Sequence, residues 1–197
     1  MWRKLAISFS FFIAITFLAG CGGELGPGNF LGIPAFILDP IYYAKVEINE
    51  HYKDLGIRKI FAVVYTDANG TAIDNSIWVF FVNKDTNLDD IASGDCAPFV
   101  VLKINDITQA TAGEHYSITS ALSTSNFMVW MDINDDGEVF VGDTIELDVD
   151  SVTQNKGSKF IGEFTSTLHR GSTTGRAEKF KFDAPVNLLN ATPLSFD

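Results

Sequence analysis

The stretch from residue 132 to residue 143 carries the clearest chemistry in the sequence. Acidic or amide side chains alternate there and a glycine, Gly137, follows them, which fits the calcium-loop pattern D-x-N-x-D-G. Ca²⁺ takes about six to eight oxygen ligands, and alternate positions place three side-chain oxygens around one point while the glycine allows a sharp turn. A following carbonyl and the carboxylate at the twelfth position would close the loop. The predicted ligands of this structural calcium ion are Asp132, Asn134, Asp136, Glu138 and Asp143.

The loop resembles the calcium loop of EF-hand proteins, with two differences. Both flanks have the composition of strands rather than helices, and the twelfth residue, Asp143, is one methylene shorter than the usual glutamate. A structural ion between strands therefore fits better than a sensor that opens a helix pair. Residues 132–150 contain eight acids and no Lys or Arg, so a divalent cation would relieve their repulsion. The alternative is an acidic hairpin loop without an ion.

Other reactive side chains show no spacing that defines a site. The three histidines lack the separation of a zinc site, no G-x-S-x-G elbow is present, and we expect ordinary surface or core histidines. The aspartates of residues 89–95 fit a solvated turn better than a catalytic pair or a second ion site. We expect Cys96 to be a small buried residue, with a reactive thiol as the alternative. Trp78 and Trp130 lie within apolar runs and are expected in the core.

The first 21 residues have the pattern of a secretory signal peptide followed by a cysteine. Arg3 and Lys4 precede an apolar run over residues 5–18, which has 14 residues and is too short to span about 30 Å of hydrocarbon. The run ends in a stretch that resembles the lipobox of bacterial lipoproteins: Leu18, Ala19, Gly20 and Cys21. The alternative is an ordinary secretory signal that happens to be followed by a cysteine.

The lipobox resemblance implies a lipoprotein held in the bacterial cell envelope through Cys21. It implies a diacylglyceryl group on the Cys21 thiol, cleavage before this residue, and acylation of the new amino terminus, for example with palmitate. Several acyl chains anchor a protein stably, whereas one chain holds it only marginally. Because Gly22 rather than Asp follows the cysteine, the resemblance favours the outer membrane over the inner one.

The remaining chain predicts one β domain behind a tether. Residues 1–20 are the expected signal peptide, residues 21–40 a flexible tether rich in Gly and Pro, and residues 41–197 the domain. Only residues 88–92 and 107–112 suggest helix, and Asp67 to Gly70 predicts a turn between strands. An all-β fold is therefore expected, an antiparallel β-sandwich of about eight or nine strands. The expected strands are 42–48, 59–66, 77–83, 99–104, 116–120, 127–132, 144–150, 160–165 and 178–182.

Hydrophobic patterning distinguishes two kinds of strand. The runs 60–65, 77–82 and 128–131 are apolar at both odd and even positions, which is typical of strands covered on both faces. Residues 144–150 instead alternate apolar and acidic side chains, which is typical of a strand with one wet face.

The calcium loop between two strands also resembles loops of bacterial transthyretin-like (prealbumin-like) sandwich domains, and residues 65–73 resemble their first hairpin. The similarity covers about Ile60 to Val149. It implies a modular surface or binding domain without a reaction. An excess of acids, 25 against 14 Lys and Arg, argues against nucleic acid as a partner.

The expected function is thus a lipid-anchored, calcium-stabilised domain that binds or scaffolds and is not an enzyme. Its partner would be a protein or a glycan. Two alternatives stay open: an envelope glycan hydrolase that uses paired carboxylates, or an assembly partner of a surface complex that offers a free sheet edge.

Overall fold

A computed structural model describes residues 45–119, 125–133 and 137–196. The chain divides between Ile41 and Tyr42, and the account below concerns the second unit. The predicted signal peptide, tether and lipidation residue Cys21 lie outside the described residues, as do the predicted ligands Asn134 and Asp136. In the described part of the chain, no helix has the length and apolar character needed to cross a membrane.

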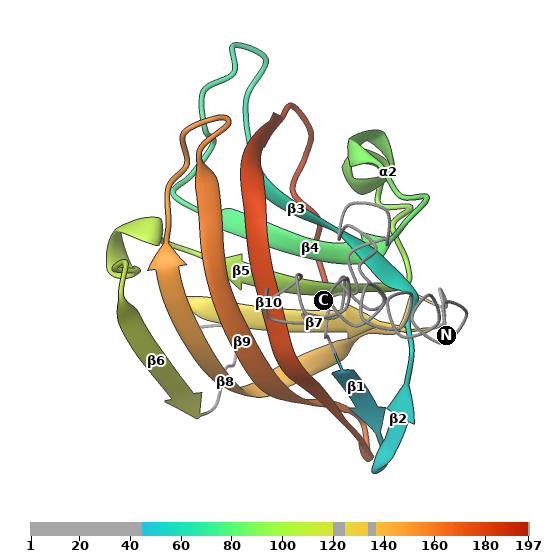
Figure 1. The fold of residues 1–197 in the computed structure, drawn as a ribbon. Coiled ribbons are helices and arrows are strands. Elements are labelled where there is room, and N and C mark those ends of the chain that lie inside the picture. Colours follow the sequence, from blue (N-terminus) through green and yellow to red (C-terminus); the bar gives the residue numbers. More distant parts are fainter. Residues whose placement is uncertain (1–44, 120–124, 134–136, 197) are drawn as a thin grey trace, which may run out of the picture. The chain divides into compact units, whose positions relative to one another are not determined.

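The domain consists almost entirely of strands (Figure 1). One short helix, α2 (Leu88–Ser93), and one 3-10 turn, η2 (Ile107–Gln109), interrupt them. The strands are β1 (Lys45–Ile48), β2 (His51–Lys53), β3 (Ile57–Tyr65), β4 (Ile77–Asn83), β5 (Phe99–Ile104), β6 (Glu114–Thr119), β7 (Phe127–Asp132), β8 (Phe140–Ser151), β9 (Lys159–Arg170) and β10 (Thr173–Leu189).

The strands form two layers that cross each other, which confirms the predicted all-β sandwich (Figure 1). We call β3, β4, β5 and β7 the back layer, and β6, β8, β9 and β10 the front layer. The layers join on one side through the antiparallel β7–β8 pair and on the other through a parallel β10–β3 pair. The remaining strand pairs between described residues are antiparallel, and β1–β2 extends the sheet beyond β10.

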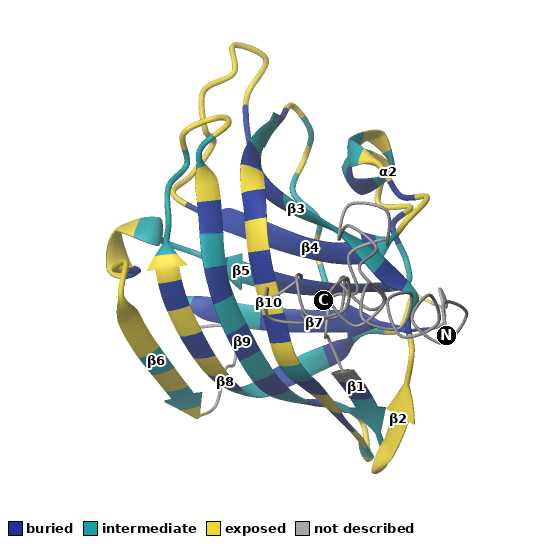
Figure 2. Ribbon diagram, in the orientation of Figure 1, coloured by how far each residue is buried: buried dark blue, intermediate teal, exposed yellow. Residues whose placement is uncertain are grey.

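The main core lies between the two layers and is rich in phenylalanine. Phe81 of the back layer packs edge-on against three rings of the front layer, with centroid distances of 5.6 Å to Phe164, 5.0 Å to Phe180 and 6.1 Å to Phe182. Alternate residues of β9 and β10 are buried in this core, and the residues between them face outward (Figure 2). The front layer therefore has one buried face and one wet face.

The back layer is buried on both faces, as its apolar runs predict. In β4, Phe81 and its alternate neighbours join the main core, whereas Trp78 and Phe80 belong to a second cluster on the outer face. Helix α2 and the segment after β10 contribute to that cluster, and the Phe196 ring lies 5.1 Å from the ring of Trp130. Trp78 and Trp130 are therefore core residues, as expected.

The local predictions agree with the structure to different degrees. Strands β4, β5 and β7 have the expected bounds, α2 corresponds to the expected helix, and the helix expected after residue 106 is only the 3-10 turn η2. Strand β2 is additional, and β8, β9 and β10 are longer than expected. Asn87 caps α2, because its side chain accepts from the helix backbone while Asp90 accepts from the Asn87 amide.

Candidate functional site

The predicted calcium loop connects β7 to β8. Strand β7 ends at Asp132, which is only 3% exposed, and β8 begins at Phe140. Asp132 thus places a carboxylate at the buried base of the loop. Gly137 adopts a φ of 75°, which is the left-handed conformation expected of a glycine at a sharp turn.

Asp143 lies within β8 rather than in the loop itself. Gly142 pairs with Leu168 and Thr144 pairs with Thr167, so Asp143 is the extra residue of a β-bulge. Its Oδ1 lies 2.7 Å from Nδ1 of His169, which is charge-contact distance. The bulge turns the Asp143 side chain toward β9.

Arg170, at the end of β9, reaches the same loop. Its Nη1 donates to the Glu138 carbonyl at 3.3 Å and lies 3.7 Å from the Glu138 carboxylate, and its guanidinium lies 4.8 Å above the Phe140 ring. The sequence places no Lys or Arg among the acids of residues 132–150. The fold supplies Arg170 and His169 from a different strand.

Three of the five predicted ligands lie in the described residues, and their chemistry suits a hard cation. Asp132, Glu138 and Asp143 offer oxygen donors of the type that Ca²⁺ prefers. The Glu138 carbonyl accepts a hydrogen bond from Arg170, and the Asp143 carboxylate lies against the His169 ring. Across the described residues, His, Cys, Asp and Glu form no group of three or more with metal-binding spacing. Calcium binding by the complete loop stays a prediction.

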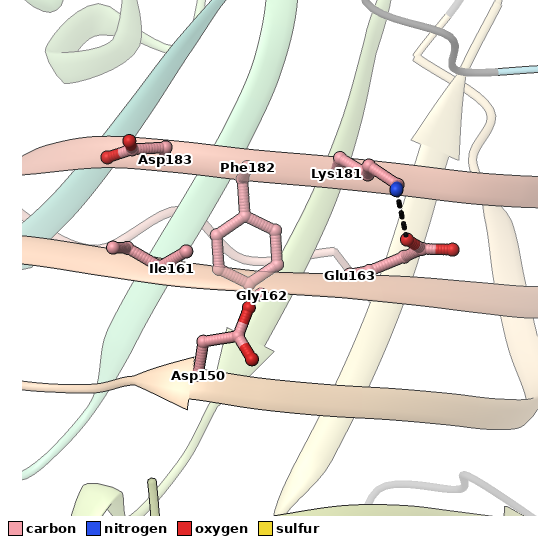
Figure 3. Close-up of a pocket in the computed structure, with 7 residues that line it drawn as sticks. All are labelled: Asp150, Ile161, Gly162, Glu163, Lys181, Phe182 and Asp183. Atoms are coloured by element: carbon pink, nitrogen blue, oxygen red, sulfur yellow. Dashed lines mark ion pairs between the residues drawn. The ribbon is translucent and has the colours of Figure 1, made fainter. Parts of the chain in front are cut away.

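The outer face of the front layer carries a shallow charged hollow of about 330 Å³ (Figure 3). The Asp150 side chain points toward Gly162, and Glu163 forms an ion pair with Lys181 at 3.2 Å. Asp183 forms a second pair with Lys159 at 2.8 Å. The residues that line the hollow are Asp150, Ile161, Gly162, Glu163, Lys181, Phe182 and Asp183. This face is therefore organised by pairs of opposite charges across neighbouring strands.

The predicted acidic alternation of β8 places Glu146 and Asp148 on this same face. His115 of β6 lies between them, 2.7 Å from Asp148 and 3.0 Å from Glu146. Sequence reasoning placed the start of this strand after His115 and so missed the contact. An alternating pattern that began two residues earlier would have put His115 on the outer face, but its partners depend on the β6–β8 register.

The remaining candidates have structural roles. Cys96 is buried in the second cluster, as expected, and Asp90 caps helix α2 rather than pairing with another carboxylate. Hydrogen bonds from turn amides and nearby side chains hold the pKa of Asp67 and of Asp106 below the usual aspartate value. Burial lowers the pKa of Lys103, whose ammonium lies 4.7 Å from the centre of the Trp78 ring.

The fold and this face define the class of the protein as an all-β sandwich with one charged outer face. Comparisons with protein-family models, with curated proteins and with solved structures found no match. The transthyretin-like resemblance accordingly stays a prediction.

Proposed function

We propose that this protein is a lipid-anchored component of the bacterial cell envelope whose β-sandwich binds or scaffolds a protein or glycan partner and does not catalyse a reaction. The observation that carries the binding role is the outer face of the front layer. Its charged side chains are arranged in cross-strand pairs, such as Glu163 with Lys181 and Asp183 with Lys159. Exposed charges held in fixed positions favour specific recognition of a partner.

Two turn aspartates have pKa values shifted in the direction opposite to the one that glycan hydrolysis needs, which favours the binding proposal. A glycan hydrolase needs a carboxylic acid whose pKa is raised so that it can protonate the leaving group. Hydrogen bonds stabilise the charged forms of the turn residues Asp67 and Asp106 and lower the pKa of each. These groups fit turn formation rather than acid catalysis.

The proposal includes a structural calcium ion in the 132–143 loop. Asp132, Asn134, Asp136, the Glu138 carbonyl and Asp143 would hold it. A bound divalent cation would supply positive charge to an acidic connection and fix the geometry of the β7–β8 turn. Three of these groups lie at the described base of the loop, and the buried Asp132 is the best placed of them.

Thermal melting of the purified protein with calcium, with magnesium and with chelator tests the ion. A ligand that binds only the native state adds about 2.7 kcal/mol at a hundredfold excess over Kd, which for a domain of this size corresponds to a rise in Tm of about 5–11 °C. Asp132→Ala removes both side-chain oxygens and should abolish the rise. Asp150→Ala, on the outer face of β8, is the matched control and should keep it. An unchanged calcium response in Asp132→Ala would refute the site.

Fractionation of cells tests the anchor. The wild-type protein should enter the membrane fraction and incorporate radiolabelled palmitate, whereas Cys21→Ser should do neither. Cys96→Ser is the control, because that thiol is buried in the domain. Labelled, membrane-bound Cys21→Ser protein would contradict lipidation at this residue.

A further inference from the structure

Strand β6 is held in the sheet by a single neighbour. β6 lies between β5 and β7 in the sequence but pairs with neither of them. It pairs with β8 alone, from Glu114 opposite Val149 to Thr119 opposite Thr144. Its side chains are mostly exposed, and only Tyr116 and Ile118 pack against the main core. β6 is therefore an edge strand, held by backbone pairing with β8, by the packing of Tyr116 and Ile118, and by side-chain contacts across the pair.

His115 makes two of these side-chain contacts. Its Nδ1 lies 2.7 Å from Oδ1 of Asp148, directly opposite on β8, and its Nε2 lies 3.0 Å from Oε2 of Glu146. The other oxygen of Glu146 accepts a hydrogen bond of 2.7 Å from the Ser117 hydroxyl. One imidazole ring thus bridges two carboxylates, and Ser117 fixes the position of one of them.

Only a protonated ring satisfies this arrangement. A neutral imidazole has one N–H and one lone pair, whereas ionised carboxylates only accept hydrogen bonds. When His115 is neutral, one ring nitrogen must present its lone pair to a carboxylate oxygen at hydrogen-bond distance. The imidazolium donates from both nitrogens and adds two favourable charge contacts.

The neighbouring charges increase the need for a proton on His115. Asp148 lies opposite Glu163 of β9, and Glu163 lies opposite Lys181 of β10, so a row of four charged positions crosses the front layer. Lys181 forms an ion pair with Glu163 at 3.2 Å. Without a charge on His115, Asp148 faces Glu163 and lacks a cation on its β6 side. Asp150 on β8 adds negative charge to the same face, whereas Glu114 lies opposite the buried Val149 and so belongs to the other face of β6.

We propose that His115 is a proton-operated latch: its imidazolium holds the edge strand β6 on β8, and loss of the proton loosens β6 while the rest of the sandwich stays folded. The hydrogen bond to Asp148, followed by the contacts with Glu146, raises the pKa of His115 above the usual histidine value. A group whose pKa is higher in the folded state stabilises it fully below its unfolded pKa, about 6.5, and this contribution is lost as pH rises through the folded pKa.

Hydrogen exchange of the full chain between pH 5.5 and pH 8.5 tests the latch, with each rate corrected for the intrinsic pH dependence of exchange. Protection of the 114–119 amides, relative to amides in the middle of β9, should fall about two- to fivefold as pH rises, the range expected for exposed ion pairs. His115→Gln should remove this pH dependence. His51→Gln is the matched control, because His51 is an exposed histidine on the other edge strand, β2, and it should behave as wild type.

Two results would overturn the proposal. The first is relative protection of β6 that does not change with pH in the wild type. The second is a pH-dependent fall that persists in His115→Gln, which would assign it to another group. Imidazole NMR gives an independent check, because the pKa of His115 must lie above the usual histidine value. A His115 pKa at or below that value would also refute the latch.

Discussion

Replacing Gly162 by alanine tests the close packing of neighbouring strands within the front layer at one atom. Gly162 lies on β9 opposite Phe182 of β10 and Val149 of β8. A Cβ at this position would overlap the carbonyl oxygen of Asp148 and would lie 2.8 Å from Cζ of Phe182. Neither neighbour is the free end of a flexible side chain, because one is backbone in a hydrogen-bonded strand and the other is a buried ring.

The cost follows from what must move. Inserting a methyl group into a packed interior costs about 1–3 kcal/mol, and displacement of backbone belongs in the upper half of that range. We therefore expect Gly162→Ala to reduce the free energy of unfolding by about 2–3 kcal/mol, which lowers Tm by about 4–12 °C for a domain of this size. The hollow of Figure 3 should change shape at the same time, since Gly162 forms part of its lining.

Urea unfolding followed by tryptophan fluorescence measures the change, with Gly175→Ala as the matched control. Gly175 is a buried glycine of β10, but a Cβ there would lie no closer than 3.3 Å to its neighbours, the nearest being the flexible end of Met131 and the ring of Phe140. Its cost should stay below about 1 kcal/mol. Equal effects of the two substitutions, or a stable Gly162→Ala variant, would refute the reasoning about close packing.

Two further substitutions probe the interior. Phe81→Ala removes the ring that contacts Phe164, Phe180 and Phe182 and should cost about 3–5 kcal/mol in urea unfolding; a loss below 1 kcal/mol would show that the site collapses around the gap. Tyr65 is 1% exposed, and burial raises its pKa well above the usual tyrosine value. Its contribution to stability is present below about pH 10 and lost above it, so Tyr65→Phe should resist alkaline unfolding better than the wild type in a pH titration at 295 nm.

The strands that were predicted with correct bounds, β4, β5 and β7, belong to the layer that is buried on both faces, although β3 of that layer was expected at 59–66 and lies at Ile57–Tyr65. β4, β5 and β7 are continuous apolar runs between polar residues, and such runs mark where burial begins and ends. β2 could not be predicted in this way, because its three residues are exposed and Tyr52 is 59% exposed. Pairing with β1, not hydrophobic burial, forms this strand.

The length of β10 was underestimated for a different reason. Its register with β9 shifts between Ala177 and Phe180, and Lys179 adopts a φ of 53° within the strand. This irregularity interrupts the two-residue alternation of buried and exposed side chains, so the pattern before it does not continue in phase with the pattern after it. The sequence consequently indicates only the central piece of a 17-residue strand.

At the candidate loop, the sequence predicts the features that depend on neighbouring residues in the chain but not the contacts that depend on strand pairing. The sequence indicates the oxygen donors and the turn, because D-x-N-x-D-G is a local pattern. It does not indicate His169 and Arg170 as neighbours of Asp143 and Glu138, because those contacts depend on the β8–β9 register and on a bulge at residue 143. Partners of charged groups across strands are set by register, and register is set by the packing of the whole sheet.

The two layers differ in what they offer a partner. Both faces of the back layer are filled by apolar clusters, so a polar ligand that approached β4 or β5 would have to displace packed aromatic rings. The front layer buries one face and leaves the other wet, with charged side chains among the outward residues of β8, β9 and β10. Recognition of a polar partner therefore belongs on the front layer, where the row from His115 to Lys181 lies. Because β6 forms one end of that row, the charge of His115 would govern both the attachment of the edge strand and the shape of the surface that a partner meets.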